Sequence, residues 1–262
     1  MCKSKNRLDG KTAIITGSNT GIGYETALDF AKRGAHVILA CRDLKKAQKS
    51  AHKIIDATGN SKIEVEYLDL GDLDVIRQFA QQINKKLTKL DLLVNNAALM
   101  ISPLTRTKQG FELQFGTNHL GHFLLTNLLL DLLKKTNKSR IVCVSSIAHT
   151  WCNINWQDIN WEKSYNPIFA YGQSKLANAL FASELARRLD NTGVSVFYLH
   201  PGAVRTSILR YLGHWFFLLP IIINVFYPFY WVTTKSPFEG SQTSIHCSVS
   251  DEALNDKGRY FR

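Results

Sequence analysis

Short apolar runs, separated by longer segments with helical periodicity, constrain the fold of this chain more than any other feature. The runs occupy residues 12–16, 36–41, 63–67, 90–95, 140–145 and 194–199, and a final candidate strand lies at 258–262. Strands that alternate with helices pair in parallel, because the chain crosses over the sheet between them. Continuous apolar runs also predict strands that are buried on both faces. The sequence therefore predicts an α/β fold with a doubly wound parallel sheet.

The length and composition of the chain favour one domain that spans residues 1–262. A chain of 262 residues with 45% hydrophobic content can bury one large core. The cysteines are odd in number and lack the spacing of metal ligands, so we expect reduced thiols. The start of the chain is polar and basic, without the apolar region of a secretory signal. These features predict an intracellular protein.

A glycine-rich segment, TGSNTGIG at residues 16–23, follows the first apolar run and opens a helical segment. This is the context in which a dinucleotide-binding turn is expected. Its glycines permit a tight turn and a close approach to a pyrophosphate, which the first N–H groups of the helix would bind. The predicted fold is therefore of the Rossmann type. The candidate cofactor-binding residues of this segment are Gly17, Ser18, Asn19, Thr20, Gly21, Ile22 and Gly23.

The end of the second predicted strand favours NADP(H) as the cofactor. NAD-binding chains place a carboxylate about 20 residues beyond the glycines, where it bonds the ribose 2′-hydroxyl, whereas an arginine accommodates a 2′-phosphate. Arg42 occupies this position and could bind the phosphate with its planar guanidinium. Asp43 is the competing ribose ligand, although it also fits the N-cap of the next helix. Asp69, followed by Leu70, is a candidate for the adenine amino group, with capping of its own loop as the alternative.

Tyr171 and Lys175 form the candidate catalytic pair. Their i,i+4 spacing places both side chains on one face of a helix. An unperturbed tyrosine has a pKa of about 10, and a fixed lysine together with a cationic nicotinamide could lower that pKa towards neutrality. The same spacing is common on solvated helix faces. The catalytic interpretation of the pair is supported by the glycine segment and by the serines Ser145 and Ser146, which precede it along the chain.

Several motifs, in this order and spacing, resemble those of the short-chain dehydrogenase/reductases, and within them the retinol dehydrogenases of the 11–14 group. They are TGSNTGIG, ACRD at 40–43, NNAA at 95–98, NHLGHFLLTNLLL at 118–130, VSSIAH at 144–149, YGQSKLAN at 171–178 and HPGAVRT at 200–206. The resemblance implies that Ser146 binds the substrate oxygen and that Tyr171 is the general acid/base. It also implies that Lys175 holds the nicotinamide ribose and that Asn118 orders a water in a proton relay. The cofactor-lining residues that it adds are Asn96, Ala97, Pro201, Gly202, Val204 and Thr206.

Two segments depart from the alternation of strands and helices. Residues 149–167 carry three tryptophans among polar residues and are predicted to form a loop over the site. Residues 211–234 contain no charged side chain, but Pro220 and Pro228 interrupt them. A membrane-spanning helix needs about 20 continuous apolar residues, so we expect instead an apolar lid that lines a lipophilic pocket or touches a bilayer. Ordinary core packing is the alternative.

The paired histidines His119 and His122 resemble a metal site only in their spacing. Histidines at i,i+3 without a nearby cysteine or carboxylate partner are usually packing or surface residues. We therefore expect no metal ion at this position.

The formal net charge of +11 is compatible with nucleic acid, an anionic membrane surface or a polyanionic cofactor as the partner. No nucleic-acid-binding motif accompanies the basic residues, so no nucleic-acid partner is expected. Peripheral membrane contact is the preferred hypothesis. The expected location is the cytoplasmic face of the endoplasmic reticulum or of another membrane, with a soluble cytoplasmic protein as the alternative. A homo-oligomer is left open.

The leading functional hypothesis is an NADP(H)-dependent oxidoreductase that interconverts retinol and retinal or a similar lipophilic alcohol and aldehyde. The alternative enzyme is a reductase of steroids, fatty aldehydes or other hydrophobic carbonyls that uses the same residues. A hypothesis of another class is a catalytically silent NADPH-binding sensor or scaffold. The complete set of Asn118, Ser146, Tyr171 and Lys175 argues against this last hypothesis.

Overall fold

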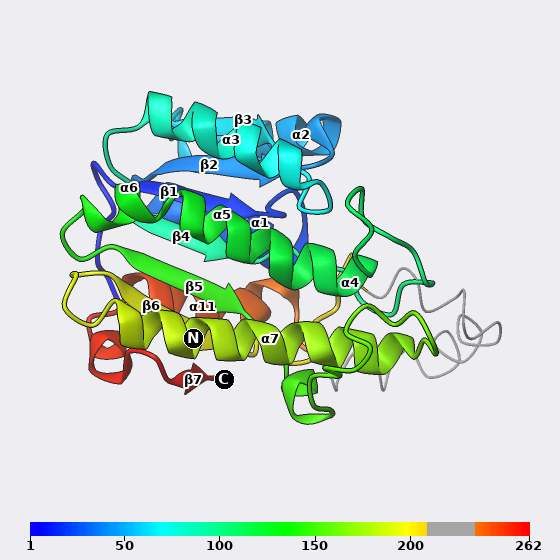
Figure 1. Cartoon of the computed structure of the whole chain (residues 1–262). Coiled ribbons are helices and arrows are strands. Elements are labelled where there is room, and N and C mark those ends of the chain that lie inside the picture. The colour runs from blue at the N-terminus through cyan, green and yellow to red at the C-terminus, as the bar shows by residue number, and fades with distance from the viewer. Residues whose placement is uncertain (209–233) are drawn as a thin grey trace.

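The computed structural model describes residues 1–208 and 234–262, and within them seven strands form one sheet (Figure 1). The strand order is β3-β2-β1-β4-β5-β6-β7, and every neighbouring pair is parallel. The strands are β1 (Thr12–Thr16), β2 (His36–Cys41), β3 (Ile63–Tyr67), β4 (Leu92–Asn95), β5 (Arg140–Val144), β6 (Ser195–Leu199) and β7 (Tyr260–Phe261). Each predicted apolar run therefore contains a strand, and the predicted doubly wound α/β fold is confirmed.

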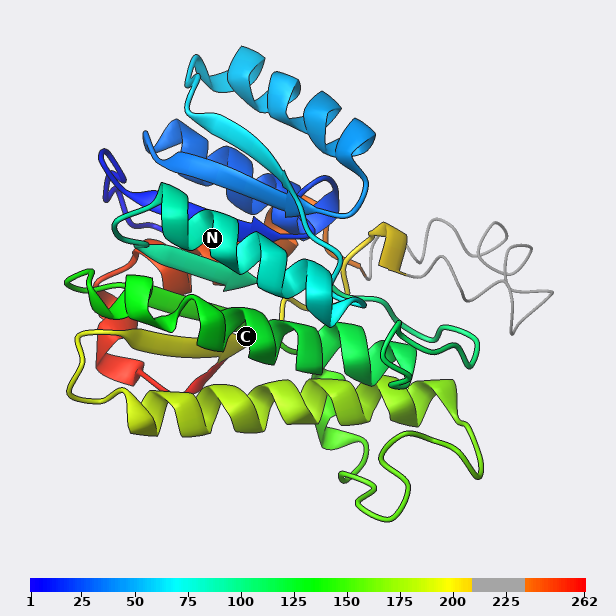
Figure 2. The same cartoon turned by 45° about the horizontal axis from the view of Figure 1, so that its top comes forward.

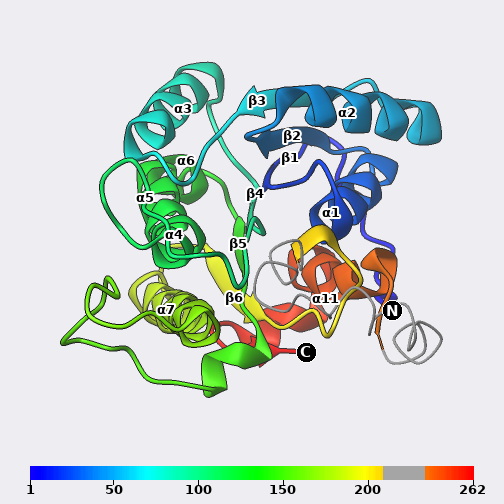
Figure 3. The same ribbon diagram turned by 90° about the vertical axis from the view of Figure 1, so that its right-hand side faces the viewer.

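Helices cover both faces of the sheet (Figure 3). One face carries α1 (Gly21–Lys32), α2 (Leu44–Thr58) and α11 (Pro237–Val249). The other carries α3 (Leu73–Lys86), α4 (Leu113–Phe115), α5 (Gly121–Leu128), α6 (Leu130–Lys134) and α7 (Pro167–Arg188). Figure 2 shows α3, α5 and α7 running side by side in front of the sheet. Shorter turns form a π-helix, η1 (Gly116–Leu120), and the 3-10 helices η2 (Ile147–Thr150) and η4 (Glu252–Asp256).

The central strands are buried on both sides, which explains why their sequences are apolar without alternation. In β1, Ala13 and Ile15 pack into the core beneath α1 and α11, whereas Ile14 packs into the core on the opposite face. Successive side chains of a strand point to opposite faces, so a strand between two helical layers needs apolar residues at every position. The edge strand β3 differs, because its Glu64 and Glu66 form ion pairs with Lys86 of α3.

The order of the strands creates the place where a ligand can bind. The chain forms β1, β2 and β3 towards one edge and then returns to place β4 on the other side of β1. Connections that leave β1 and β4 therefore diverge to opposite faces of the sheet. In open α/β sheets this divergence leaves a crevice at the carboxyl ends of the two strands.

The predicted lid at 211–234 lies outside the described residues, except for Thr234. Among the helices in residues 1–208 and 234–262, none combines the length and apolar character that crossing a bilayer requires.

Candidate active site

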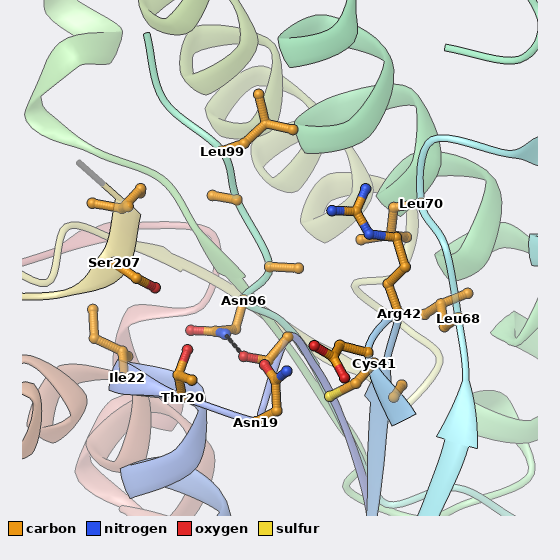
Figure 4. A pocket seen from close by; sticks show the side chains of 18 of the residues that line it. Asn19, Thr20, Ile22, Cys41, Arg42, Leu68, Leu70, Asn96, Leu99 and Ser207 are labelled. Carbon is orange, nitrogen blue, oxygen red and sulfur yellow. Dashed lines mark hydrogen bonds between the residues drawn. The ribbon is translucent and has the colours of Figure 1, made fainter. Parts of the chain in front are cut away.

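A cleft of about 380 Å³ lies at the carboxyl ends of β1, β2 and β4, where the strand order reverses (Figure 4). Figure 4 shows Asn19, Thr20 and Ile22 of the glycine segment on one side of it and Arg42 at the end of β2 on another. The predicted cofactor residues that line the cleft are Gly17, Asn19, Thr20, Gly21, Ile22, Gly23, Arg42, Asp69, Leu70, Asn96, Ala97 and Thr206. Ser18 is instead fully buried, and its hydroxyl donates to the Ile15 carbonyl at 2.9 Å.

The glycines of the first turn are required by their conformation and by close contacts. Gly17 has a φ of +64° and Gly21 a φ of +60°, in the left-handed region that favours glycine. A Cβ atom at Gly17 would lie 2.9 Å from the Cα atom of Ala97, and one at Gly23 would lie 2.5 Å from Asn96 Nδ2. Helix α1 begins at Gly21, so its first N–H groups face the cleft. A narrow glycine-lined turn at a helix N-terminus fits the pyrophosphate of a dinucleotide.

Thr16 ties the turn after β1 to the segment after β4. Its Oγ1 atom accepts the backbone N–H groups of Asn96 and Ala97, both at 2.9 Å. The side-chain amide of Asn96 in turn donates to the Thr16 carbonyl at 2.8 Å. The two turns therefore form one rigid wall of the cleft.

The two candidate ribose ligands after β2, Arg42 and Asp43, both line the cleft. Asp43 is the N-cap of α2, and its Oδ1 atom accepts the Lys46 N–H at 3.0 Å. The N-cap interpretation of Asp43 is thus confirmed. Arg42 is 65% exposed at the cleft, so its guanidinium is accessible to a phosphate. Lys46 also lines the cleft, which sequence reasoning missed. Its position in the first turn after the cap was the available signal.

Asp69 caps its own loop, because its Oδ1 atom accepts the Gly71 N–H at 2.9 Å. Its Oδ2 atom lies 3.9 Å from the Arg42 guanidinium. Asp69 and Leu70 both line the cleft. Contact between Asp69 and an adenine amino group stays a prediction.

Tyr171 and Lys175 lie in the first turns of α7, the helix that Asn166 caps. Both are buried, Tyr171 at 5% and Lys175 at 1% exposure. The Lys175 ammonium lies 5.7 Å from the centre of the Tyr171 ring and donates to the Val144 carbonyl at 2.9 Å. The predicted shared face is therefore present, and the end of β5 fixes the lysine against it.

Burial controls the ionisation of this pair in opposite directions. It raises the pKa of Tyr171 to about 12, with a hydrogen bond to Ser146 acting in the lowering direction. It lowers the pKa of Lys175 to about 8, and the nearby Cys143 opposes that change. The expected lowering of the Tyr171 pKa is thus not found in the free protein, because the cost of burying a phenolate outweighs the favourable contacts. The phenol keeps its proton at neutral pH.

The two adjacent serines have different environments. The Ser146 hydroxyl caps η2 by accepting the Ala148 N–H at 3.2 Å, and it is the serine that bonds Tyr171. The Ser145 hydroxyl is buried and donates to the Lys175 carbonyl at 2.8 Å. Ser146 therefore belongs to the candidate site, and Ser145 anchors the backbone of α7 to β5.

Asn118 is fully buried in the π-helical turn η1. Its side chain exchanges two hydrogen bonds of 2.9 Å with the backbone of Leu99 and donates to the Ser174 hydroxyl at 3.0 Å. Asn118 thereby joins the segment after β4 to the helix that carries Tyr171. Its role in ordering a relay water stays a prediction.

Pro201, Gly202 and Val204 lie in the loop after β6 and are not among the described residues that line the cleft. Gly202 has a φ of +91°, and a Cβ atom there would lie 2.9 Å from Cδ of Lys235. Val204 pairs with Lys235 in an isolated parallel bridge. Their predicted contact with the cofactor stays a prediction, whereas Thr206 does line the cleft.

The tryptophan-containing segment 149–167 lies beside the start of α7. Gln173 holds it there, because its side chain accepts the Asn155 N–H and donates to the Ile159 carbonyl, both at 3.0 Å. Trp156 and Ile159 line a second, largely apolar groove of about 450 Å³ against α5 and α7. That this segment covers the substrate site stays a prediction.

Comparison with known proteins gives a consistent result. The family model described as short chain dehydrogenase matches residues 11–215. Retinol dehydrogenase 13 of Mus musculus is 48% identical over 262 residues, covering 99% of this chain and 78% of the relative. Retinol dehydrogenase 12 of Mus musculus is 45% identical over 261 residues, covering 100% of this chain and 80% of the relative.

A solved structure from Beutenbergia cavernae is also similar. It is described as a candidate NAD(P)-dependent gluconate 5-dehydrogenase and contains NADP at low occupancy. It has a TM-score of 0.75 and 25% sequence identity, covering 97% of this chain and 95% of its own.

Proposed function

The chain belongs to the short chain dehydrogenase family, and from this premise we propose that it is an NADP(H)-dependent oxidoreductase that interconverts retinol and retinal. The observation that carries the proposal is a group at the carboxyl end of β5, formed by the buried Tyr171 and Lys175 and the half-buried Ser146. The names of the similar mammalian proteins support retinol as the alcohol.

The chemistry divides between the cofactor and three side chains. When bound, reduced nicotinamide supplies a hydride to the carbonyl carbon. Ser146 and Tyr171 bond the carbonyl oxygen, and Tyr171 transfers its proton to that oxygen. Lys175, largely protonated below its pKa of about 8, holds the ribose. Tyr171 is protonated at neutral pH, as proton donation to the carbonyl oxygen requires.

The choice of NADP(H) is supported by the charges after β2. Arg42 and Lys46 both line the cleft and can bind a 2′-phosphate. The carboxylate that would favour NAD, Asp43, is engaged as a helix cap. The second oxygen of Asp43, Oδ2, lies 3.5 Å from the Lys46 ammonium, so a ribose 2′-hydroxyl would share that oxygen with a cation.

Membrane association of this protein is proposed from its sequence. The uncharged, aromatic segment 211–234 and the net charge of +11 support peripheral binding at the cytoplasmic face of an anionic membrane. The protein should sediment with anionic liposomes and be released by alkaline carbonate. Failure to sediment at low salt would contradict the proposal.

The substrate is tested with purified protein, NADPH and three carbonyl compounds: all-trans-retinal, a medium-chain aldehyde and a ketosteroid. The proposal expects the highest kcat/KM for retinal. Turnover of the ketosteroid alone would favour the steroid alternative, and NADPH binding without turnover of any compound would favour a silent sensor.

A further inference from the structure

His122 is not among the described residues that line the cleft and has no part in the chemistry proposed above. It is 2% exposed, and both ring nitrogens have partners. Nε2 lies 2.9 Å from Oγ1 of Thr16, and Nδ1 lies 2.9 Å from the carbonyl oxygen of Asn118. His122 thus links Thr16 at the end of β1 to Asn118 in η1.

The hydrogen bonds of Thr16 determine which nitrogen of His122 carries the proton. The Thr16 hydroxyl accepts two backbone N–H groups, from Asn96 and Ala97, and has one hydrogen to donate. His122 Nε2 is 2.9 Å away, whereas the Val94 carbonyl is 3.4 Å away. Nε2 therefore accepts from Thr16, which leaves Nδ1 to donate to the Asn118 carbonyl. Full burial, which lowers the pKa of His122 to about 3, agrees with this neutral form.

The two partners of His122 each hold a segment that lines the cleft. Thr16 holds the backbone of Asn96 and Ala97. Asn118 holds the backbone of Leu99, which also lines the cleft. Thr16 and Asn118 are thus each bonded directly to the segment after β4, and His122 adds a bridge between Thr16 and Asn118 themselves.

We propose that His122 is a positioning residue for the dinucleotide, acting as a neutral imidazole that holds Thr16 and Asn118 in the arrangement that binds it. This inference rests on the proposed cofactor. His119 provides a contrast, because its Nδ1 atom bonds Asn178 of α7 at 3.1 Å and its ring packs near Phe123 and Phe181. His119 faces the second groove and contacts neither Thr16 nor Asn118 through a described hydrogen bond.

Three substitutions separate the two hydrogen bonds of His122. His122→Gln places an amide group near the position of Nε2 and can still accept from Thr16, whereas His122→Asn reaches only the position of Nδ1. His122→Phe keeps a ring and removes both bonds. The Asn118 carbonyl keeps Asn178 Nδ2 as a donor at 3.0 Å, so the bond whose loss matters is the one to Thr16. Its loss weakens NADPH binding by about tenfold for His122→Phe and His122→Asn, while His122→Gln stays within about threefold of the parent. His119→Gln is the matched control and binds like the parent.

The readouts are the NADPH dissociation constant, from nicotinamide fluorescence, and the melting temperature, measured separately. Thr16→Val combined with His122→Asn should bind no more weakly than Thr16→Val alone, because His122→Asn lacks only the contact that Thr16→Val already removes. Two results would overturn the role of His122 and leave the proposed function intact. One is parental NADPH affinity in His122→Phe, and the other is a double variant whose loss of affinity equals the sum of the two single losses. If His122→Phe does not fold, the Gln and Asn variants decide, and equal affinities for these two would overturn it. A parent protein that binds no NADPH would overturn the proposed function, and this inference with it.

Discussion

Replacing Arg42 with alanine should weaken the binding of NADPH and leave the binding of NADH nearly unchanged. The guanidinium lies at the cleft and is 65% exposed. In the free protein Asp69 is 3.9 Å away, beyond hydrogen-bond distance, so the substitution removes little that stabilises the fold. The phosphate of NADPH is the partner that is lost.

The size of the effect follows from exposure and charge. A hydrogen bond to a charged group contributes about 1.5–3 kcal/mol. Because solvent screens an exposed pair, we take the lower end, which corresponds to roughly tenfold in the dissociation constant. Lys46 stays at the cleft in the variant and limits the loss.

The assay is titration of both cofactors by fluorescence, with Arg77→Ala as the control. Arg77 is 57% exposed on α3 and lies 3.8 Å from Asp74, which closely matches the environment of Arg42 away from the cleft. Equal losses of NADPH and NADH binding would show that Arg42 is structural. No loss for either cofactor would remove the support for a phosphate site at the end of β2.

Three further predictions concern the catalytic group and the glycine turn. Tyr171→Phe should abolish turnover in steady-state assays while NADPH affinity changes little, because the buried ring is kept and only the proton donor is lost; near-normal turnover would exclude Tyr171 as the acid. The kcat/KM for NADPH should fall above about pH 8, because Lys175 loses its proton there. Tyr171 should add no second step to the pH profile below about pH 10, because its pKa is about 12. A flat pH profile would contradict the role of Lys175. Gly23→Ala should weaken NADPH binding by at least about tenfold. Its Cβ atom would lie 2.5 Å from Asn96 Nδ2 and 2.7 Å from the Gly17 carbonyl oxygen. Parental affinity would show that this turn does not hold the pyrophosphate.

Local patterns in the sequence were sufficient for the framework of the fold. Continuous apolar runs predicted the central strands because a strand such as β1 faces two helical layers and has no polar side. Glycine at positions 17 and 21 predicted the cofactor turn because the backbone there adopts a positive φ. Asp43 was recognisable as a cap because capping depends on neighbours three residues away.

Contacts between distant segments were not predictable in the same way. The separate environments of Ser145 and Ser146 depend on how β5 meets α7, about 30 residues further along the chain. The sequence predicts only that His122 binds no metal ion. Its contact with Thr16 could not be predicted, because the two residues are 106 positions apart in the chain. Asn118 lies in a π-helical turn, where the usual i,i+4 reasoning on helix faces does not apply.

The proposed reaction is hydride transfer from the nicotinamide to a lipophilic aldehyde, with Tyr171 as the proton donor. The most direct measurement is mass analysis of the product formed from all-trans-retinal and NADPH deuterated at both C4 positions, with the parent protein and with Tyr171→Phe. The parent protein should give retinol that carries one deuterium on its alcohol carbon, and the variant should give no product. Retinol without deuterium, or equal yields from the two proteins, would contradict it.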